Sequence, residues 1–182
     1  VMLGLAVLFV IQLIGRTTAA IQIQESAIAR ERLLTRTGGA LVVAQSWDGV
    51  YSAAIDGARG LAGDPWARAF VALGGSDELA IVAVDGADAV PLANQKLPLS
   101  RLSEQDRQSL HQHGAFAVGS EPQARWGFDR YARAGEQFWV TPLKLRGQLK
   151  GALVVGARAL PEGCLEALTV VASQVSMAME AA

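Results

Sequence analysis

The chain has 182 residues, of which 51% are apolar and 18% are charged, and its formal net charge is −1. This composition favours a packed core over disorder, and the absence of a basic excess excludes an electrostatic surface for nucleic acid. The single cysteine, Cys164, excludes an internal disulfide and points to a reducing compartment. This length suits one domain with an appendage.

The N-terminal segment is an apolar run. Residues 1–15 are apolar apart from Gln12 and would span roughly 22 Å as a helix, less than a bilayer core requires. We interpret them as part of a transmembrane helix that the start of this sequence cuts. Residues 16–36 hold more arginine than acid, which places this flank in the cytoplasm. A signal-peptide core cleaved near Thr18–Ala20 and a buried core helix are the alternatives.

A helical linker is predicted over residues 16–38, which contain no proline and no glycine before Gly38. Ile14, Ile21 and Ile28 recur every seven residues, a period that favours a left-handed helix pair. The other heptad core positions, between these isoleucines, are polar. The contact between the two helices would therefore be weak, as in a linker that transmits a signal. A solvated helix leaving the membrane is the alternative. We expect Gly38 and Gly39 to interrupt this helix.

The remainder, residues 39–182, is predicted to form a domain of the α+β class. Ser46 and Ser103 are predicted to cap helices, the second with Asp106 in a capping-box arrangement. Pro142 confines its strand to an edge or a bulge. The expected elements are helices at 41–44 and 50–61, a hairpin of strands 67–73 and 78–84, an extended piece at 97–99, a helix from 103, a strand at 116–118, a hairpin of strands 138–143 and 151–155 turning at 146–147, and a helix over 162–182.

The last helix carries an apolar stripe with steps of three and four residues, which is able to pack on a sheet or to dimerise and continue into an output module. The stripe consists of Leu165, Leu168, Ala172, Val175 and Met179.

Two stretches resemble GAF domains. Trp139–Val155 is similar to the "vPL…rG…GvLvl" hairpin of that family, and Leu165–Glu180 is similar to its closing "LeaLa.Q.a.Ale" helix. The match covers residues 36–182. A third stretch, Ala29–Leu41, resembles the entry into GAF domains of actinobacterial cyclic-di-GMP proteins, which carry membrane helices before it and PAS, GGDEF and EAL modules after it.

The resemblance implies a GAF-like antiparallel sheet flanked by helices, preceded here by the partial transmembrane helix and the linker. It also implies a ligand pocket between the sheet and its middle loop, and a homodimer formed through the terminal helices. Aromatic and arginine side chains of that loop suit a planar anionic ligand that remains unidentified. The candidate ligand-binding residues are Trp126, Phe128, Arg130, Tyr131 and Trp139. A sealed core under a long loop is the alternative.

No catalytic or metal site is predicted. Cys164 lacks the second cysteine that methionine sulfoxide reduction requires, and His111 and His113 point to different faces of a helix. The sequence lacks a P-loop, and Asn94–Lys96 is not followed by the rest of the cyclic-nucleotide signature.

We therefore expect a non-enzymatic sensory domain of a bacterial inner-membrane protein, with the domain in the cytoplasm and no cofactor identified. The expected output is a diguanylate cyclase or phosphodiesterase. A histidine-kinase sensor, a small redox or hydrolytic enzyme on this fold and an extracytoplasmic domain behind an uncleaved anchor are the alternatives.

Overall fold

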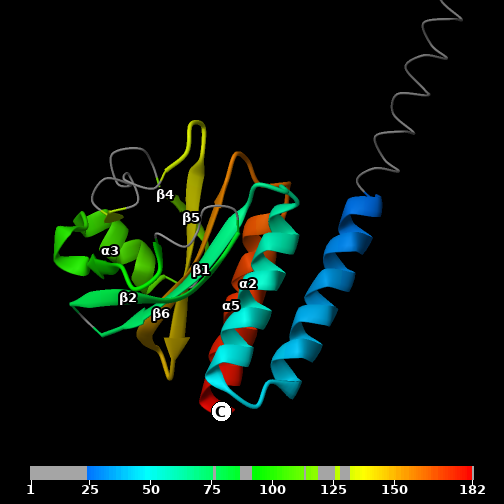
Figure 1. Cartoon of the computed structure of the whole chain (residues 1–182), viewed down its shortest axis with the longest axis horizontal. Coiled ribbons are helices and arrows are strands. Elements are labelled where there is room, and N and C mark those ends of the chain that lie inside the picture. Colours follow the sequence, from blue (N-terminus) through cyan, green and yellow to red (C-terminus); the bar gives the residue numbers. More distant parts are fainter. Residues whose placement is uncertain are drawn as a thin grey trace, which may run out of the picture.

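The computed structural model describes residues 24–75, 77–86, 92–112, 114–118, 126–127 and 132–181. Within them a six-stranded sheet has the order β3-β2-β1-β6-β5-β4, and every neighbouring pair of strands is antiparallel. Helices cover the sheet on both sides (Figure 1). The predicted α+β class with an antiparallel sheet is confirmed.

Both predicted hairpins are present, as β1–β2 and β5–β6. The second turns at Arg146 and Gly147, whose φ angles of 50° and 79° are the positive values that a tight two-residue hairpin turn requires. The strands are β1 (Arg68–Gly74), β2 (Glu78–Asp85), β3 (Lys96–Pro98), β4 (Phe116–Val118), β5 (Gln137–Leu145) and β6 (Gln148–Ala157). The helices are residues 24–43, α2 (Trp47–Ala62), the 3₁₀ turn η2 (Leu99–Arg101), α3 (Glu104–His111) and α5 (Cys164–Ala181).

The predicted N-caps are confirmed. The Ser46 hydroxyl accepts a hydrogen bond from the Gly49 N–H at 3.2 Å and begins α2. The Ser103 hydroxyl accepts one from the Asp106 N–H at 3.1 Å and begins α3. Each bond satisfies an amide that the first helical turn leaves without a partner.

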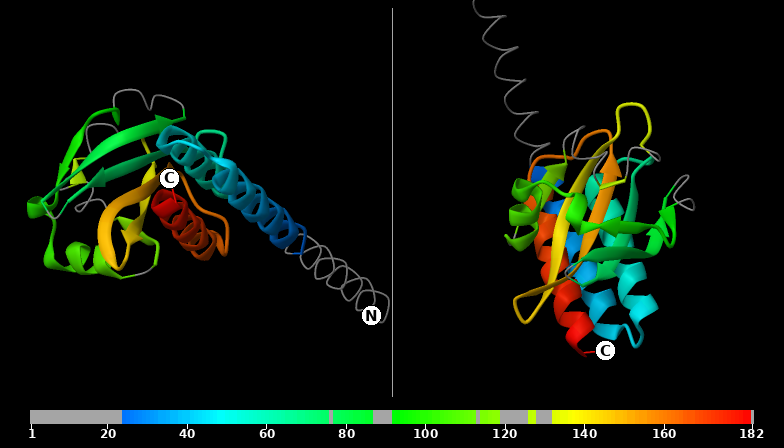
Figure 2. Two further views of the ribbon diagram at one scale, coloured as in Figure 1. Left: turned by 90° about the horizontal axis from the view of Figure 1, so that it is seen from below. Right: turned by 90° about the vertical axis from the view of Figure 1, so that its left-hand side faces the viewer.

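The sheet has one apolar core on each face, because successive strand residues point to opposite sides. On β1, Ala69 and Val71 face α2 and α5, which we call the helix side. Phe70 and Ala72 face α3 and η2, which we call the α3 side. Figure 2 shows α3 across the sheet from α2 and α5.

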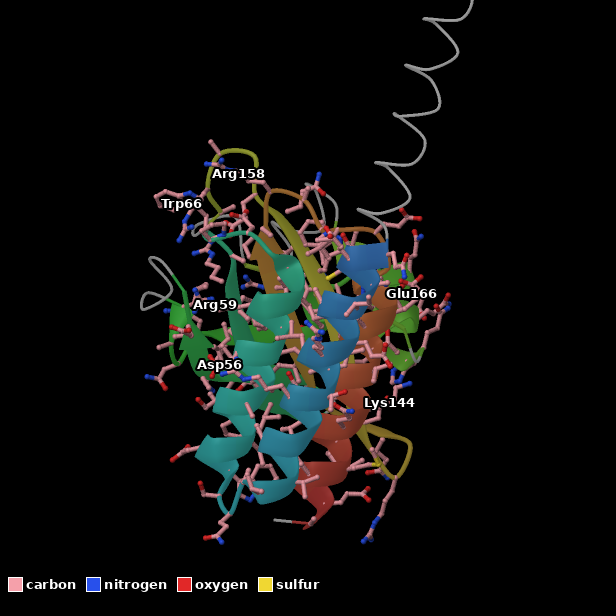
Figure 3. All side chains as sticks on the ribbon, turned by 90° about the vertical axis from the view of Figure 1, so that its right-hand side faces the viewer. Asp56, Arg59, Trp66, Lys144, Arg158 and Glu166 are labelled. Carbon is pink, nitrogen blue, oxygen red and sulfur yellow. The ribbon has the colours of Figure 1, made fainter. Side chains whose placement is uncertain are left out.

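The first helix differs from the prediction, because residues 24–43 are helical straight through Gly38 and Gly39. This helix lies over the seam between α2 and α5 (Figure 3). Its buried side chains are Thr37 and Leu41, at 4% and 3% exposure. This packing outweighs the cost of two glycines, about 1 kcal/mol each. The proposed boundary between residues 38 and 39 thus falls inside one helix.

No helix among the described residues is both long and apolar enough to cross a bilayer. The predicted partial span, residues 1–15, lies outside the described residues, as does most of the predicted isoleucine seam.

The apolar stripe of α5 is confirmed except at its first member. Leu168, Ala172, Val175 and Met179 are buried in the helix-side core. Leu165, in the first turn of the helix, is 36% exposed and is not part of that core.

Candidate functional site

The α3 side of the sheet is where a ligand pocket was expected. Its described apolar side chains pack on one another, with Trp126 at 1% exposure and its ring centroid 6.3 Å from that of Phe116. Trp126 therefore lies on the predicted side. Phe128, Arg130 and Tyr131 lie outside the described residues.

Trp139 lies on the other face. It is 7% exposed and belongs to the helix-side core, while its strand neighbours Phe138 and Val140 occupy the α3 side. The expectation that Trp126 and Trp139 cluster at one pocket is therefore wrong. The reason is the strand period of two, which sends residue 139 away from residues 138 and 140. Trp126 remains a predicted ligand contact.

A buried ion pair lies on the α3 side and was not foreseen. The Arg68 and Glu136 side chains are 1% and 5% exposed, with Nε–Oε1 and Nη2–Oε2 distances of 2.7 and 2.6 Å. The guanidinium carbon lies 5.5 Å from the centroid of the Phe138 ring. This bidentate geometry and the aromatic face are what allow a guanidinium to be buried.

Gly156 makes room for that pair. A Cβ at this position would lie 2.5 Å from Glu136 Oε1 and 2.7 Å from a Phe138 ring carbon. The Glu136 carboxylate also accepts the Arg133 N–H at 2.9 Å, which fixes the turn before β5. The one signal in the sequence was an arginine inside an apolar strand.

The flank of α5 is attached to the free edge of the sheet. Thr169 Oγ1 accepts the backbone N–H of Ala115 at 3.1 Å, and Ser176 Oγ accepts that of Lys144 at 3.2 Å. The Lys144 ammonium donates to the carbonyl of His111, the last residue of α3. The end of α3 and the start of β4 are therefore linked to α5 by hydrogen bonds.

Pro142 lies at this same edge, as predicted. β4 pairs only with residues 138–140 of β5, so Pro142 has no outer neighbour strand, and the register shifts between Leu143 and Lys144. A residue without an N–H is tolerated at such a position. The polar side chains of α5 cover the edge that β4 leaves open.

An open groove of about 620 Å³ lies between the first helix and the last turns of α5. Its rim carries Val42 at 85% exposure and Met177 at 63% exposure. Apolar side chains this exposed, side by side on two helices, are typical of an interaction surface. The groove is lined by Gly38, Leu41, Val42, Ala44, Gln174, Met177, Ala178 and Ala181.

Cys164 is the only thiol and is buried, at 2% exposure. Its Sγ donates to the Leu61 carbonyl at 3.5 Å. Burial is the largest influence on the thiol and raises its pKa to about 11, against a smaller lowering by Arg30. The reactive thiolate is therefore disfavoured at neutral pH. Within the described ranges, no three His, Cys, Asp or Glu side chains form a metal site.

We expect the Cys164 thiol to lower the free energy of unfolding as the pH becomes alkaline. Folding raises the pKa of this thiol from the ordinary 9.0 to about 11. The stabilisation that the neutral thiol contributes to the folded state is therefore fully present below pH 9 and is lost as the pH rises to about 11. The expected loss is on the order of 2–3 kcal/mol, because each pKa unit corresponds to about 1.4 kcal/mol. Urea unfolding of the wild type and Cys164→Ala across this interval measures it. Parallel curves for the two proteins would contradict it.

No family model matches the sequence, and a search of curated proteins returns no significant match. Solved structures do match. The chromophore-binding domain of Stigmatella aurantiaca bacteriophytochrome superposes with a TM-score of 0.68 at 15% identity, over 84% of this chain and 60% of that one. A longer photosensory core module of Stigmatella aurantiaca phytochrome is covered over 37% of its length.

Two other matches are covered almost completely. The A. aeolicus nlh2 GAF domain gives a TM-score of 0.64 at 11% identity, over 86% of this chain and 98% of that one. Residues 122 to 287 of a methyl-accepting chemotaxis protein give 0.62 at 16% identity, over 82% and 97%. Together with the sheet and helix arrangement described above, these likenesses establish that the chain has the GAF fold.

Proposed function

We propose that this chain is a non-catalytic sensory domain of GAF type, in which events on the α3 side bias the packing of the terminal helices. The observation that carries the proposal is the placement of α5. One face of this helix packs on the sheet, and its Thr169 holds the Ala115 backbone that leads from α3 into β4. A ligand that moves α3 or the following loop would therefore act on α5 as well.

The matched proteins support a sensory role by analogy, since they include phytochrome domains and a chemotaxis protein. We further propose that residues 1–15 anchor the chain in the inner membrane with the domain in the cytoplasm. The proposed output is a cyclic-di-GMP cyclase or phosphodiesterase beyond residue 182. Sequencing the parent reading frame tests this output: a GGDEF or EAL module supports it, and a kinase core or a stop codon contradicts it.

The proposed partner is a second copy of the chain, bound through the terminal helices. The open groove between the first helix and α5 offers the apolar surface for this contact, with Val42 and Met177 on its rim. Helices from two subunits that meet here would form a bundle, in which a small change in packing is transmitted along the helix axes.

Replacing Val42 and Met177 together with aspartate is expected to weaken dimerisation by about tenfold or more, because two charges would be buried at the contact. Sedimentation equilibrium of the 182-residue chain in detergent micelles measures the effect. Val82→Asp is the matched control, since Val82 is 45% exposed on β2, away from the groove. A monomeric wild type, or equal effects of both changes, would refute the proposed dimer.

A further inference from the structure

One end of the domain presents exposed apolar side chains on two neighbouring loops, which the functional proposal above does not involve. Pro65 and Trp66 follow α2, and Pro161 lies between β6 and α5. All three are exposed, Trp66 at 57%. The two loops are adjacent, since a Cβ at Gly63 would lie 3.8 Å from Pro161 Cγ. Exposed apolar side chains that gather on neighbouring loops indicate a contact surface, which we call the Trp66 surface.

Hydrogen bonds fix the turn that carries Trp66. Its backbone N–H donates to one carboxylate oxygen of Asp64 at 2.9 Å, and its carbonyl accepts from the Arg133 guanidinium at 3.0 Å. The other Asp64 oxygen accepts the Arg158 N–H at 3.4 Å, which joins this turn to the loop after β6. The indole is therefore held in solvent by a rigid backbone, so meeting a partner costs it little conformational entropy.

Arg158 supplies a cation beside the indole. Its side chain is exposed, and within the described part of the chain it makes no ion pair. It lines a notch of about 50 Å³ together with Trp66. The two acidic residues of the lining are already engaged, Asp64 by backbone N–H groups and Glu136 by its buried ion pair. A guanidinium beside an exposed indole suits a phosphate group at the boundary of an apolar phase.

The Trp66 surface lies at the end of the domain where the first helix begins. Residues 44–46 are the whole connection between the first helix and α2, and packed helices joined by so short a loop run antiparallel. Residue 24 is therefore at the same end as Ala62, the last residue of α2, and Figure 3 shows Trp66 and Arg158 at this end. Only residues 16–23 separate the apolar run from residue 24, and they reach at most about 30 Å.

We propose that the Trp66 surface docks on the headgroup region of a phospholipid bilayer, an inference that rests on the proposed membrane anchor at residues 1–15. The indole lies at the level where tryptophan is enriched in membrane proteins, between the lipid tails and water. The Arg158 guanidinium donates hydrogen bonds to a lipid phosphate. Glu162 follows Arg158 by four residues, so the contact gains little from net charge and requires no anionic lipid.

Fluorescence quenching by brominated phosphatidylcholine tests the docking, with the 182-residue chain reconstituted in vesicles of this lipid. Trp47 is the matched control, because it begins α2 at the opposite end of the domain and is 42% exposed. The Trp47→Phe protein keeps Trp66 and should lose more fluorescence than the Trp66→Phe protein, which keeps Trp47. The buried tryptophans are common to both proteins. Adding Arg158→Gln to Trp47→Phe should reduce the quenching, whereas adding Arg146→Gln, beyond the far end of β5, should leave it unchanged.

Flotation of the same vesicles separates this inference from the anchor on which it rests. A chain that floats with the vesicles but shows equal quenching of the Trp47→Phe and Trp66→Phe proteins overturns the docking and leaves the anchor in place. A chain that does not float overturns the anchor, and the docking with it. Weaker dimerisation of Trp66→Ser, with no difference in quenching between the two phenylalanine variants, would instead assign the Trp66 surface to a second copy of the chain.

Discussion

Replacing Glu136 with glutamine is expected to lower the free energy of unfolding by about 3–5 kcal/mol. The change leaves the Arg68 guanidinium, at 1% exposure, inside the α3-side core without its carboxylate. A buried cation cannot recover its hydration, and the aromatic face of Phe138 supplies only a small part of the lost stabilisation. Urea unfolding followed by circular dichroism measures the loss.

Asp85→Asn is the matched control. It also neutralises a carboxylate without changing its shape, but the Arg59–Asp85 pair is 31% and 52% exposed. Water and salt screen such a pair, so the expected cost stays below about 1 kcal/mol. If both substitutions cost the same, the Arg68–Glu136 pair is not desolvated and the prediction fails.

Removing both charges separates the penalty of a lone ion from the value of the pair. Arg68→Met combined with Glu136→Leu is expected to recover most of the stability lost in either single variant, since apolar replacements of buried ion pairs are often neutral. The replacement at residue 136 has to fit the space beside Phe138 that Gly156 leaves open by having no side chain. A ligand-binding defect in a stable double variant would then show that the pair also serves the α3 side.

The elements that the sequence predicts well are governed by local chemistry. The two hairpins are set by their apolar runs and by glycine-containing turns, and the caps at Ser46 and Ser103 need only residues three positions away. These signals act within a few residues, so they do not depend on how distant parts of the chain pack.

The features that the prediction missed depend on contacts between distant segments. The Arg68–Glu136 pair joins residues 68 positions apart. The side that Trp139 faces depends on strand register, and β5 is apolar on both faces, so alternation gives no indication. The first helix continues through Gly38 and Gly39 because Thr37 and Leu41 pack on the domain. Helix propensity takes no account of such tertiary contacts.

Gly57→Leu is expected to detach the first helix from the domain. A Cβ at residue 57 would lie 2.6 Å from Thr37 Cγ2 and Oγ1, and one at Gly60 would lie 2.8 Å from a Leu33 methyl group. These two glycines let the first helix approach α2 closely. Thr37 is branched at Cβ and 4% exposed, so it cannot swing aside. Overpacking of this kind costs about 1–3 kcal/mol.

Few side chains oppose that cost, since Thr37 and Leu41 are the buried residues of the first helix and Leu33 and Leu34 are only partly buried against the core. The helix is therefore expected to separate rather than force α2 off the sheet, where Val50, Ala54 and Ala58 are fully buried. Hydrogen exchange of residues 30–43 should then speed up by about tenfold to a hundredfold, with protection of the sheet unchanged. Loss of protection throughout the sheet would contradict local detachment.

Gly39→Ala provides the control within the same helix. No atom lies within 4 Å of a Cβ built there, and alanine favours a helix interior over glycine, so this change should increase protection slightly. The difference between the two variants bears on the proposed relay, because the first helix follows residues 1–23 in the chain and leads into the described domain. Because Gly38, Leu41 and Val42 of the first helix line the groove proposed for dimerisation, detachment of this helix would disrupt both that contact and the N-terminal input. Docking through two buried and a few partly buried side chains is weak enough for an input to shift, and the caps at Ser46 and Gly63 hold α2 in place while it does.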